Sequence, residues 1–468
     1  MTERAIAILA QFVHATVSSA TLPEHVRKLA RDSIYDTVSV SVGAAGNQEL
    51  NELALIVRTG AGSARDLLGR PSTLEHAAFV NGLLAHALDY DDTHFPSVLH
   101  PSSVVIPAVV ASATATPITK AQLVAAVAAG REVAVRLGLA GYDRTRRASI
   151  FMERGFHATA LCGCIAAAGV LAALRGLDPP GCGHAMAIAC SMTGGLIEGN
   201  RAGGMVKPFH NAWAALTAVV ASRLAAHGLT GPDTAIDGPY GFLTSHVGAP
   251  WAAGWSDGLG DEWATANVYT KAYPTNHFLH AAIDGALQIR QRLSPDSLRE
   301  VVVGLPAQVI GVVGEPHQFK VSPRTPYEAR FSAPYVVAAA LTGDGTLTLR
   351  DFSPARLRDL VASDLIGRVR VVADPEATSR FPDRLAAQLA VQSAAGQRST
   401  VWVDAVTGGP ARPMTSSQAS QKLTDCVVHA QLGGREHAIR ASLNALVDAS
   451  GSAAADLRAL LTAVGGER

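Results

Sequence analysis

The stretch HALDYDDTHFPSVLHPSS, residues 86–103, concentrates side chains that can transfer protons and bind charged groups. Three aspartates, three histidines and a threonine lie between His86 and His100, and both flanks, FVNGLLAHAL and VVIPAVVASA, are apolar. Burying charges is costly unless they are paired or bind a ligand, so a mostly buried stretch of this kind indicates a functional site. Histidines beside carboxylates would supply acid–base groups near neutral pH.

Three other stretches also place ionisable residues in apolar surroundings. Each has a simpler structural explanation, since one histidine in an apolar helix is commonly a hydrogen-bonded core residue and Asp91 or Asp92 can cap a helix or turn. In combination, a lysine, an arginine and several histidines facing a cleft would bind a multiply anionic small molecule. The stretches are RGFHATA with His157, GNRAGGMVKPFHNAWAA with Arg201, Lys207 and His210, and KAYPTNHFLHAAID with Lys271, Tyr273, His277 and His280.

Two other kinds of site stay open for the aspartate run. Asp89-x-Asp91-Asp92 fits the D-x-D-D pattern of proton-initiated terpene cyclases, but those enzymes stabilise carbocations with aromatic walls, and only 5% of this chain is aromatic. A hard metal ion could bind aspartate and histidine side chains of residues 89–100. No H-E-x-x-H or similar framework accompanies them, so we expect no metal in the site.

The elements that position these residues are mostly helical. Residues 1 to about 267 repeat Ala, Leu and Val at three- and four-residue spacing, which predicts helices. The run GLDPP, residues 176–180, predicts the end of one helix and the start of the next. Farther along, β-branched and alternating runs predict strands at 298–310, 367–374, 385–393 and 399–406, with helices near 328–342 and 355–363.

The simplest arrangement of these elements is a mainly-α fold with two domains. Residues 1–267 and 409–468 would form one large all-helical domain from both ends of the chain. Residues 268–408 would form an inserted, smaller α+β lid domain. A cleft between two such domains is a common place for a small-molecule site.

Composition and charge narrow the functional class. The 468 residues are 48% hydrophobic and 17% charged, as expected for a globular protein with a large core. Lys+Arg and Asp+Glu both number 39, and the resulting zero net charge argues against a partner that is a nucleic acid or a membrane surface. Charges from Glu3 onward argue against a signal peptide, and five cysteines without a disulfide framework indicate a reducing cytoplasm. Two uncharged stretches, 93–119 and 155–174, fit buried helices better than membrane spans.

Taken together, the chain resembles the MmgE/PrpD family, which includes 2-methylcitrate dehydratase, cis-aconitate decarboxylase and iminodisuccinate epimerase. The resemblance implies a helical domain plus an α+β lid, a homodimer, and no metal or organic cofactor. The matching stretches occur in family order along nearly the whole chain: HALDYDDTHFPSVLHPSS, GFHATALCGCIAAAGVLAALRGLD, MVKPFHNAWAA with GLTGPDTAIDGPYGF, KAYP with His280-Ala-Ala-Ile-Asp284, EARFSAPYVVAAAL, and GGPARPMT with Lys422.

The resemblance also implies which residues line the pocket. At matching motif positions these are Asp89, Thr93, His100, His157, Lys207 and Lys271. Two departures point to a different substrate. The spacing from Thr93 to His100 is one residue longer than in the decarboxylases, and Asn276 stands where some members place a pocket histidine, with His277 next to it.

These residues support a mechanism that passes through a carbanion or enolate-like species. As a hypothesis, Lys207 and Lys271 bind substrate carboxylates, because developing negative charge is best met by preorganised cations. His157 and His100 would form the proton-transfer pair. Asp89 would orient one of them and Thr93 would donate a hydrogen bond. Further candidates for substrate binding are Arg201, His210, Asn276 and His277.

We therefore predict a cofactor-independent lyase, a dehydratase or a decarboxylase, that acts on a small anionic polycarboxylate. The alternatives are an epimerase of a dicarboxylate such as iminodisuccinate, a non-catalytic anion-binding homologue, and a metal-dependent enzyme. The same acid–base residues would serve dehydration, decarboxylation and epimerisation, so the sequence leaves the reaction and the substrate open.

Overall fold

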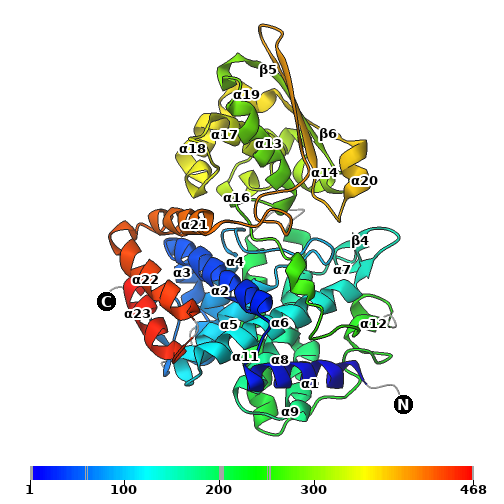
Figure 1. The fold of residues 1–468 in the computed structure, drawn as a ribbon, viewed down its shortest axis with the longest axis vertical. Coiled ribbons are helices and arrows are strands. Elements are labelled where there is room, and N and C mark those ends of the chain that lie inside the picture. The colour runs from blue at the N-terminus through cyan, green and yellow to red at the C-terminus, as the bar shows by residue number, and fades with distance from the viewer. Residues whose placement is uncertain are drawn as a thin grey trace. The chain divides into compact units, whose positions relative to one another are not determined.

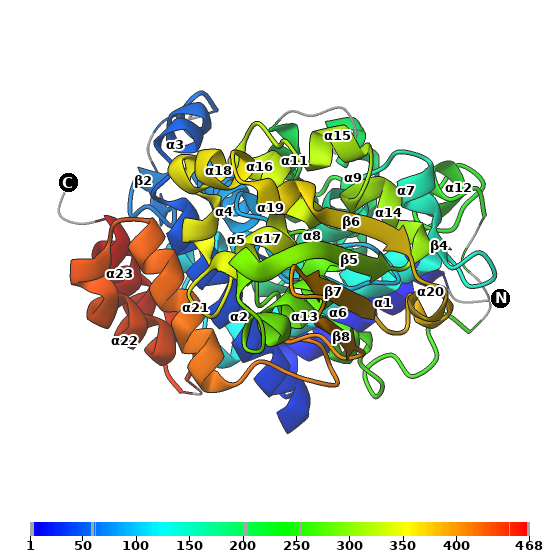
Figure 2. The same cartoon turned by 90° about the horizontal axis from the view of Figure 1, so that it is seen from above.

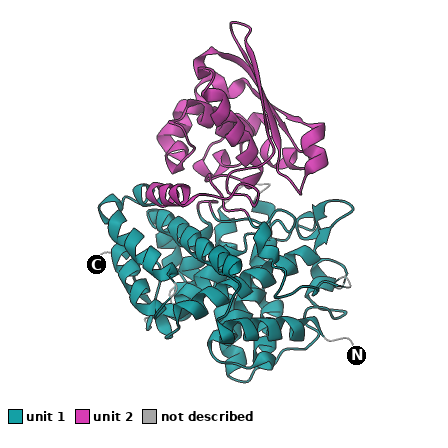
Figure 3. Ribbon diagram, viewed as in Figure 1, with its two compact units in different colours: residues 1–87, 91–268, 426–468 teal, residues 88–90, 269–425 magenta. Residues whose placement is uncertain are grey.

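The computed structural model describes residues 4–57, 60, 62–199, 205–249, 251, 254–448 and 450–465. The chain divides into two compact units (Figure 3). Unit 1 comprises residues 1–87, 91–268 and 426–468, and unit 2 comprises Leu88–Tyr90 and Tyr269–Asp425. The fold is mainly α with two domains, as predicted. The sequence pattern put the domain boundaries near residues 268 and 408, whereas unit 2 runs from Tyr269 to Asp425 and also includes Leu88–Tyr90.

Unit 1 is built mainly from helices. In chain order these are α1 (Ala5–Ser19), α2 (Glu24–Ala44), α3 (Gln48–Leu55), α4 (Leu74–His86), α5 (Ser102–Ala115), α6 (Lys120–Ala140), α7 (Ile150–Glu153), α8 (Ala158–Leu174), α9 (Pro179–Met192), α11 (Val206–Ala226), α12 (Phe242–His246), the 3-10 helices η1 (Ala264–Asn267) and η5 (Gly433–Arg435), α22 (Glu436–Val447) and α23 (Ala453–Gly465). Two short antiparallel hairpins pair β1 (Ala64–Arg65) with β2 (Pro71–Ser72) and β3 (Tyr142–Asp143) with β4 (Ala148–Ser149).

Small residues let the helices of unit 1 approach closely. α8 packs against α5, α6, α9 and α11 (Figure 1), and nearly all of its side chains are buried. A Cβ added at Gly163 would come within 2.8 Å of Val104 Cβ, so only glycine allows this crossing of α8 and α5. Close packing at this density explains the alanine- and glycine-rich sequence.

The predicted break between two helices at residues 176–180 is confirmed. Gly176 has a φ of 82°, the left-handed conformation that commonly ends a helix. The side chain of Asp178 then accepts a hydrogen bond from Gly181 N at 2.9 Å and caps α9, which begins with Pro179.

The length and apolar character of the helices bear on whether the chain could cross a membrane. Among the residues described, no single helix is long and apolar enough for a span. α1 and α2 meet the length and composition only as a pair, and the pair is bent by 88°.

Unit 2 contains a four-stranded sheet in the order β6-β5-β7-β8. β5 (Leu298–Leu305) runs parallel to β6 (Val369–Ala373) and antiparallel to β7 (Ala387–Ser393), which pairs antiparallel with β8 (Arg398–Val403). Helices α13 (His280–Arg290) and α17 (Ala333–Thr342) pack against the sheet (Figure 2). Burial alternates along β7, as expected for a strand with one face on the core.

Short helices and turns complete unit 2. They are η2 (His277–Leu279), η3 (Pro295–Ser297), α14 (Ala307–Val313), α15 (His317–Lys320), α16 (Pro326–Ala329), η4 (Leu349–Phe352), α18 (Pro354–Val361), α19 (Asp364–Gly367), α20 (Pro375–Arg380) and α21 (Ser416–His429), whose last four residues belong to unit 1.

The predicted strands are confirmed except for the length of the first. The pattern predicted a strand over 298–310, but β5 ends at Leu305 and α14 begins at Ala307. The intervening Pro306 has no N–H for the ladder and stands at the N-cap of α14, so it ends the strand. The apolar residues that follow it are β-branched but belong to a helix, which periodicity in so short a run does not reveal.

Candidate active site

The stretch 86–103 is buried, as its apolar flanks predict. It leaves α4 at His86 and enters α5 at Ser102, and its residues are divided between the two units. The side chains of Asp91, Asp92 and His100 are at most 6% exposed. Two residues with left-handed backbone, Asp89 (φ 50°) and Val98 (φ 49°), turn the chain between the two helices.

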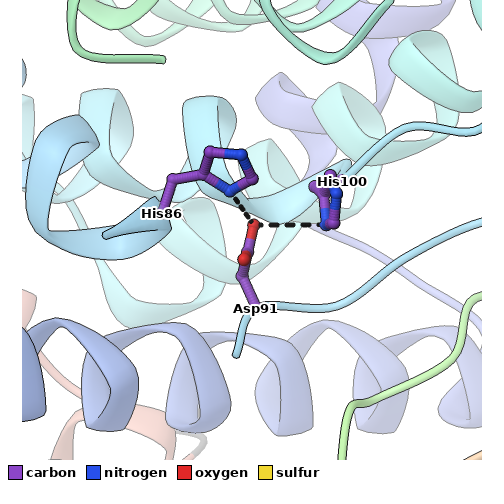
Figure 4. Close-up of side chains that lie close together, drawn as sticks. All are labelled: His86, Asp91 and His100. Carbon is purple, nitrogen blue, oxygen red and sulfur yellow. Dashed lines mark hydrogen bonds and ion pairs between the residues drawn. The ribbon is translucent and has the colours of Figure 1, made fainter. Parts of the chain in front are cut away.

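Asp91, the first aspartate of the run that belongs to unit 1, contacts two histidines. Its Oδ2 lies 2.7 Å from His86 Nδ1 and 3.4 Å from His100 Nδ1 (Figure 4). His100 Nδ1 also lies 2.7 Å from the carbonyl oxygen of Asp92. A carbonyl oxygen only accepts, so His100 Nδ1 carries a proton, and Nε2 is the basic nitrogen of the neutral ring. Asp91 and the carbonyl together fix this tautomer.

Asp92 has a structural role. Its carboxylate pairs with Arg131 of α6 at 3.1 Å and accepts hydrogen bonds from Ser102 Oγ at 2.6 Å and Ser102 N at 3.2 Å. Burial raises the pKa of Asp92, and the charge of Arg131 opposes that shift. Asp92 therefore caps the first residue of α5 and ties it to α6, which is the simpler explanation that the sequence allowed.

Asp89 belongs to unit 2 and has a third set of partners. Lys271 Nζ lies 3.3 Å from its Oδ1 and donates to its backbone carbonyl at 2.7 Å. Both side chains are nearly fully buried. The three carboxylates of the D-x-D-D run thus bind different groups and do not form one shared acid, which argues against the terpene-cyclase alternative.

Four imidazoles gather in unit 1. The ring centroids of His100 and His86 are 4.7 Å apart, those of His86 and His157 are 5.7 Å apart, and those of His157 and His210 are 5.3 Å apart. His157 is the N-cap residue of α8, and His210 lies in the first turns of α11 beside the buried Lys207. The structure therefore brings together the predicted residues His100, His157, Lys207 and His210.

The electrostatics of this cluster favour neutral imidazoles. Burial lowers the pKa of His157 well below its ordinary value, and His86, Lys207 and His210 lower it further. Burial, with His86 and Lys207, lowers the pKa of His210 to about 4. The Nδ1 atoms of His157 and His210 are 3.2 Å apart, so one donates and the other accepts. His157 Nε2 is buried and has no hydrogen-bond partner among the residues that the structure describes.

Unit 2 holds the other predicted residues. Asn276 Oδ1 accepts from Phe278 N at 3.0 Å and caps η2, so this atom serves the local fold. His277 is buried with its ring centroid 4.2 Å from that of Phe278. His280 has a buried Nε2 without a hydrogen-bond partner within the described chain, and burial, then Lys271 and Lys422, lowers its pKa to about 3.

Two more residues were predicted to bind substrate. Thr93 is fully buried in unit 1, and Arg201 lies outside the described residues. Sequence reasoning missed several residues that contact the predicted ones. His86 begins the opening stretch, and His280, Arg330 and Lys422 stand in stretches that carry the resemblance, so their positions gave a signal although no role was assigned to them.

The cluster of His86, Asp91 and His100 also has the residue types of a metal site. One ligand atom from each lies within 4.8 Å of the others. The contacts are those of hydrogen bonds, however, because His100 Nδ1 carries a proton that it shares with a carbonyl oxygen. A metal bound at these atoms would require loss of that proton and of the short bond between His86 and Asp91.

Comparisons with known proteins bear on this arrangement. Models of the MmgE/PrpD N-terminal domain and the MmgE/PrpD C-terminal domain match residues 7–252 and 273–445. The chain is similar to "Cis-aconitate decarboxylase-like protein oryM" of Aspergillus oryzae (strain ATCC 42149 / RIB 40), 29% identical over 322 residues that cover 64% of this chain and 65% of that protein. It is also similar to cis-aconitate decarboxylase of Mus musculus, 25% identical over 431 residues (86% of this chain, 82% of the relative). For cis-aconitate decarboxylase of Homo sapiens, the identity is 27% over 363 residues (74% and 71%). The match to the Aspergillus protein thus spans just under two thirds of that relative's length.

Proposed function

Because this chain belongs to the MmgE/PrpD family, we propose that it is a cofactor-independent lyase that acts on a small polycarboxylate by proton transfer next to a carboxylate. The observation that carries the proposal is the set of four imidazoles beside Lys207 in unit 1, of which those of His86, His100 and His157 are buried and that of His210 is half-buried. Decarboxylation is the leading reaction, since relatives that align over most of the chain are named cis-aconitate decarboxylases.

The cluster suits an anionic substrate. Lys207 is buried, and burial together with the positive charge of Lys207 and His86 lowers the pKa of His157 and His210. A bound polycarboxylate would oppose this shift, because negative charge nearby favours the imidazolium form. Substrate binding would therefore bring a proton onto the histidines at the moment when it is needed.

Decarboxylation then needs only a cation near the developing negative charge and a proton donor. The carbon–carbon bond to the departing carboxylate breaks, carbon dioxide leaves, and the electron pair remains on carbon, delocalised into the rest of the substrate. Lys207 stabilises the developing negative charge. An imidazolium, His157 in our assignment, gives its proton to that carbon and is protonated again from water.

His100 would act through Nε2. Its Nδ1 proton is held by Asp91 and the carbonyl of Asp92. A carboxylate in this position orients the ring and stabilises the imidazolium that forms during proton transfer. In a dehydration, His157 and His100 would act on different protons. One would remove a proton next to a carboxylate, and the other would protonate the departing hydroxyl.

The test is to incubate the purified protein with cis-aconitate, citrate, 2-methylcitrate and iminodisuccinate in deuterated water and to follow each by proton NMR. Loss of carbon dioxide with one deuteron incorporated at carbon is the expected outcome for a tricarboxylate of the cis-aconitate type. Loss or gain of water would make the protein a dehydratase, and exchange at one carbon without net reaction would make it an epimerase. No change in any of the four would contradict the proposed activity on this class of substrate.

A further inference from the structure

The segment Leu88–Tyr90 of unit 2 is held by three buried cations. Arg330 donates a hydrogen bond to the backbone carbonyl of Leu88. Lys271 donates to that of Asp89, and Lys422 donates to that of Tyr90. The bonds from Lys271 and Lys422 measure 2.7 and 2.9 Å. The three side chains are 5%, 1% and 4% exposed, so these bonds form away from water, where they are strong.

Lys422 does more than hold one carbonyl. Its Nζ also donates to the backbone carbonyl of Lys271 at 2.8 Å. The same ammonium lies 4.0 Å from the centroid of the Tyr90 ring, a favourable cation–π contact. One ammonium therefore ties the segment that carries Asp89 to the segment that carries Lys271.

The backbone at Asp89 needs such support. Its φ of 50° is uncommon for a residue other than glycine, and such conformations persist when surrounding contacts fix them. The Asp89–Lys271 ion pair can form only while the two backbone segments that carry these residues keep their positions relative to each other. We infer that Lys422 is the positioning residue for this pair, a role that rests on the proposed lyase function and on the sequence-based hypothesis that Lys271 binds a substrate carboxylate.

Lys422, although itself buried, forms part of the lining of a cavity. The volume of the cavity is about 380 Å³, and Lys422 lines it together with Tyr90, Tyr273, Asp284 and Asp425, all in unit 2. Shortening Lys422 would enlarge this cavity toward the two carbonyls. A small amine could then enter and donate the hydrogen bonds that the lysine made.

The first experiment compares Lys422→Met with a matched control, Lys320→Met. Lys320 also bridges two backbone carbonyls of unit 2, those of Val312 (2.6 Å) and Phe331 (2.9 Å), neither of which carries the ion pair. Lys422→Met should lower kcat/KM by about 10²-fold, the scale of a positional error near a reacting group, mainly through KM. Lys320→Met should leave both constants within about twofold. Equal effects of the two variants would overturn the inference.

A second measurement does not depend on activity. Acetic anhydride acylates lysine, and the rate at Lys271 can be followed on its peptide by mass spectrometry. This rate should rise about tenfold in Lys422→Met, the scale on which removal of an orienting partner acts. It should stay unchanged in Lys320→Met. An unchanged rate would contradict the positioning role even if no substrate were turned over. Should Lys422→Met not fold, Lys422→Arg serves instead, since the longer, planar guanidinium keeps the charge but does not place a nitrogen where Nζ of Lys422 lies.

Chemical rescue tests the role of the ammonium itself. Propylammonium should restore at least part of kcat/KM to Lys422→Ala, whereas tetramethylammonium, which has the charge but no N–H, should not. Rescue by neither ion would contradict a role for hydrogen bonds from Lys422, and rescue by both would assign the effect to charge alone.

Discussion

Nδ1 of the buried His157 lies 3.2 Å from Nδ1 of the half-buried His210 in unit 1. Two imidazolium rings would repel each other at this distance, so at least one ring is neutral. The low pKa of both residues makes both neutral near pH 7. The resting site is therefore a set of bases beside a lysine, ready to take up protons together with an anion.

Proton uptake on binding is the first prediction. A tricarboxylate that cannot react, tricarballylate, should raise the pKa of His157 and His210, so its affinity should increase as the pH falls from 8 to 6. Calorimetry in buffers of different ionisation enthalpy should show protons entering the complex. The same titration of His157→Gln should take up fewer protons. An affinity that does not change with pH would contradict this reading of the cluster.

Acid stability is the second prediction, and it concerns two other histidines. Burial lowers the pKa of His94 and of His280 from 6.5 to about 3. Between these values the unfolded chain binds a proton that the folded chain does not, so stability is complete above pH 6.5 and falls as the pH drops. Protonation of each histidine should lower the free energy of unfolding by roughly 1 kcal/mol per pH unit in this window. Urea unfolding of His94→Gln should show a shallower pH dependence than the wild type, and an equal dependence would refute the assignment.

Asp91 and Asp92 should respond differently to the same substitution. Asp91→Asn removes the carboxylate that orients His100 and should lower kcat by about 10²-fold, with a shifted pH–rate profile. Asp92→Asn breaks a buried pair with Arg131 and should instead lower the free energy of unfolding by about 3–5 kcal/mol. Steady-state kinetics and denaturant unfolding of both variants give the comparison. If both variants lost stability but kept the wild-type kcat, Asp91 would not take part in proton transfer.

Removal of metal ions should have no effect on turnover. His86, Asp91 and His100 make hydrogen bonds that a bound cation would replace. We expect protein dialysed against a chelator to keep its activity and to contain less than one metal ion per chain by elemental analysis. Loss of activity that zinc or iron restores would instead favour the metal-dependent alternative.

Much of this architecture was predictable because it follows from local pattern. The helices of unit 1 follow from periodicity, and the strands of unit 2 follow from β-branched runs. The burial of Asp91 and His100 follows from their apolar flanks. The pairing of His86 with Asp91 does not, because it depends on how the chain turns at Asp89 after leaving α4.

Long-range contacts were the part that the sequence could not supply. Lys422 and Tyr90 are 332 residues apart in the chain, yet the ammonium of one binds the carbonyl of the other. The family resemblance drew attention to Lys422 but gave it no partner. Likewise, the sequence places Asp89, Asp91 and Asp92 in one short run that resembles a single acidic cluster. In the structure each of them contacts a different cation or histidine.

The most direct test of the central claim is the turnover of His157→Gln on whichever polycarboxylate the wild type consumes. Glutamine keeps a polar side chain of similar size but cannot carry the proton. We expect a loss of about 10²–10⁴-fold in kcat with unchanged unfolding behaviour, the range for removal of a general acid or base. The control is His184→Gln, since His184 is a half-buried histidine of unit 1 that bonds the carbonyl of Gly231 and should be dispensable. Wild-type turnover by His157→Gln would show that the buried histidines do not transfer the proton.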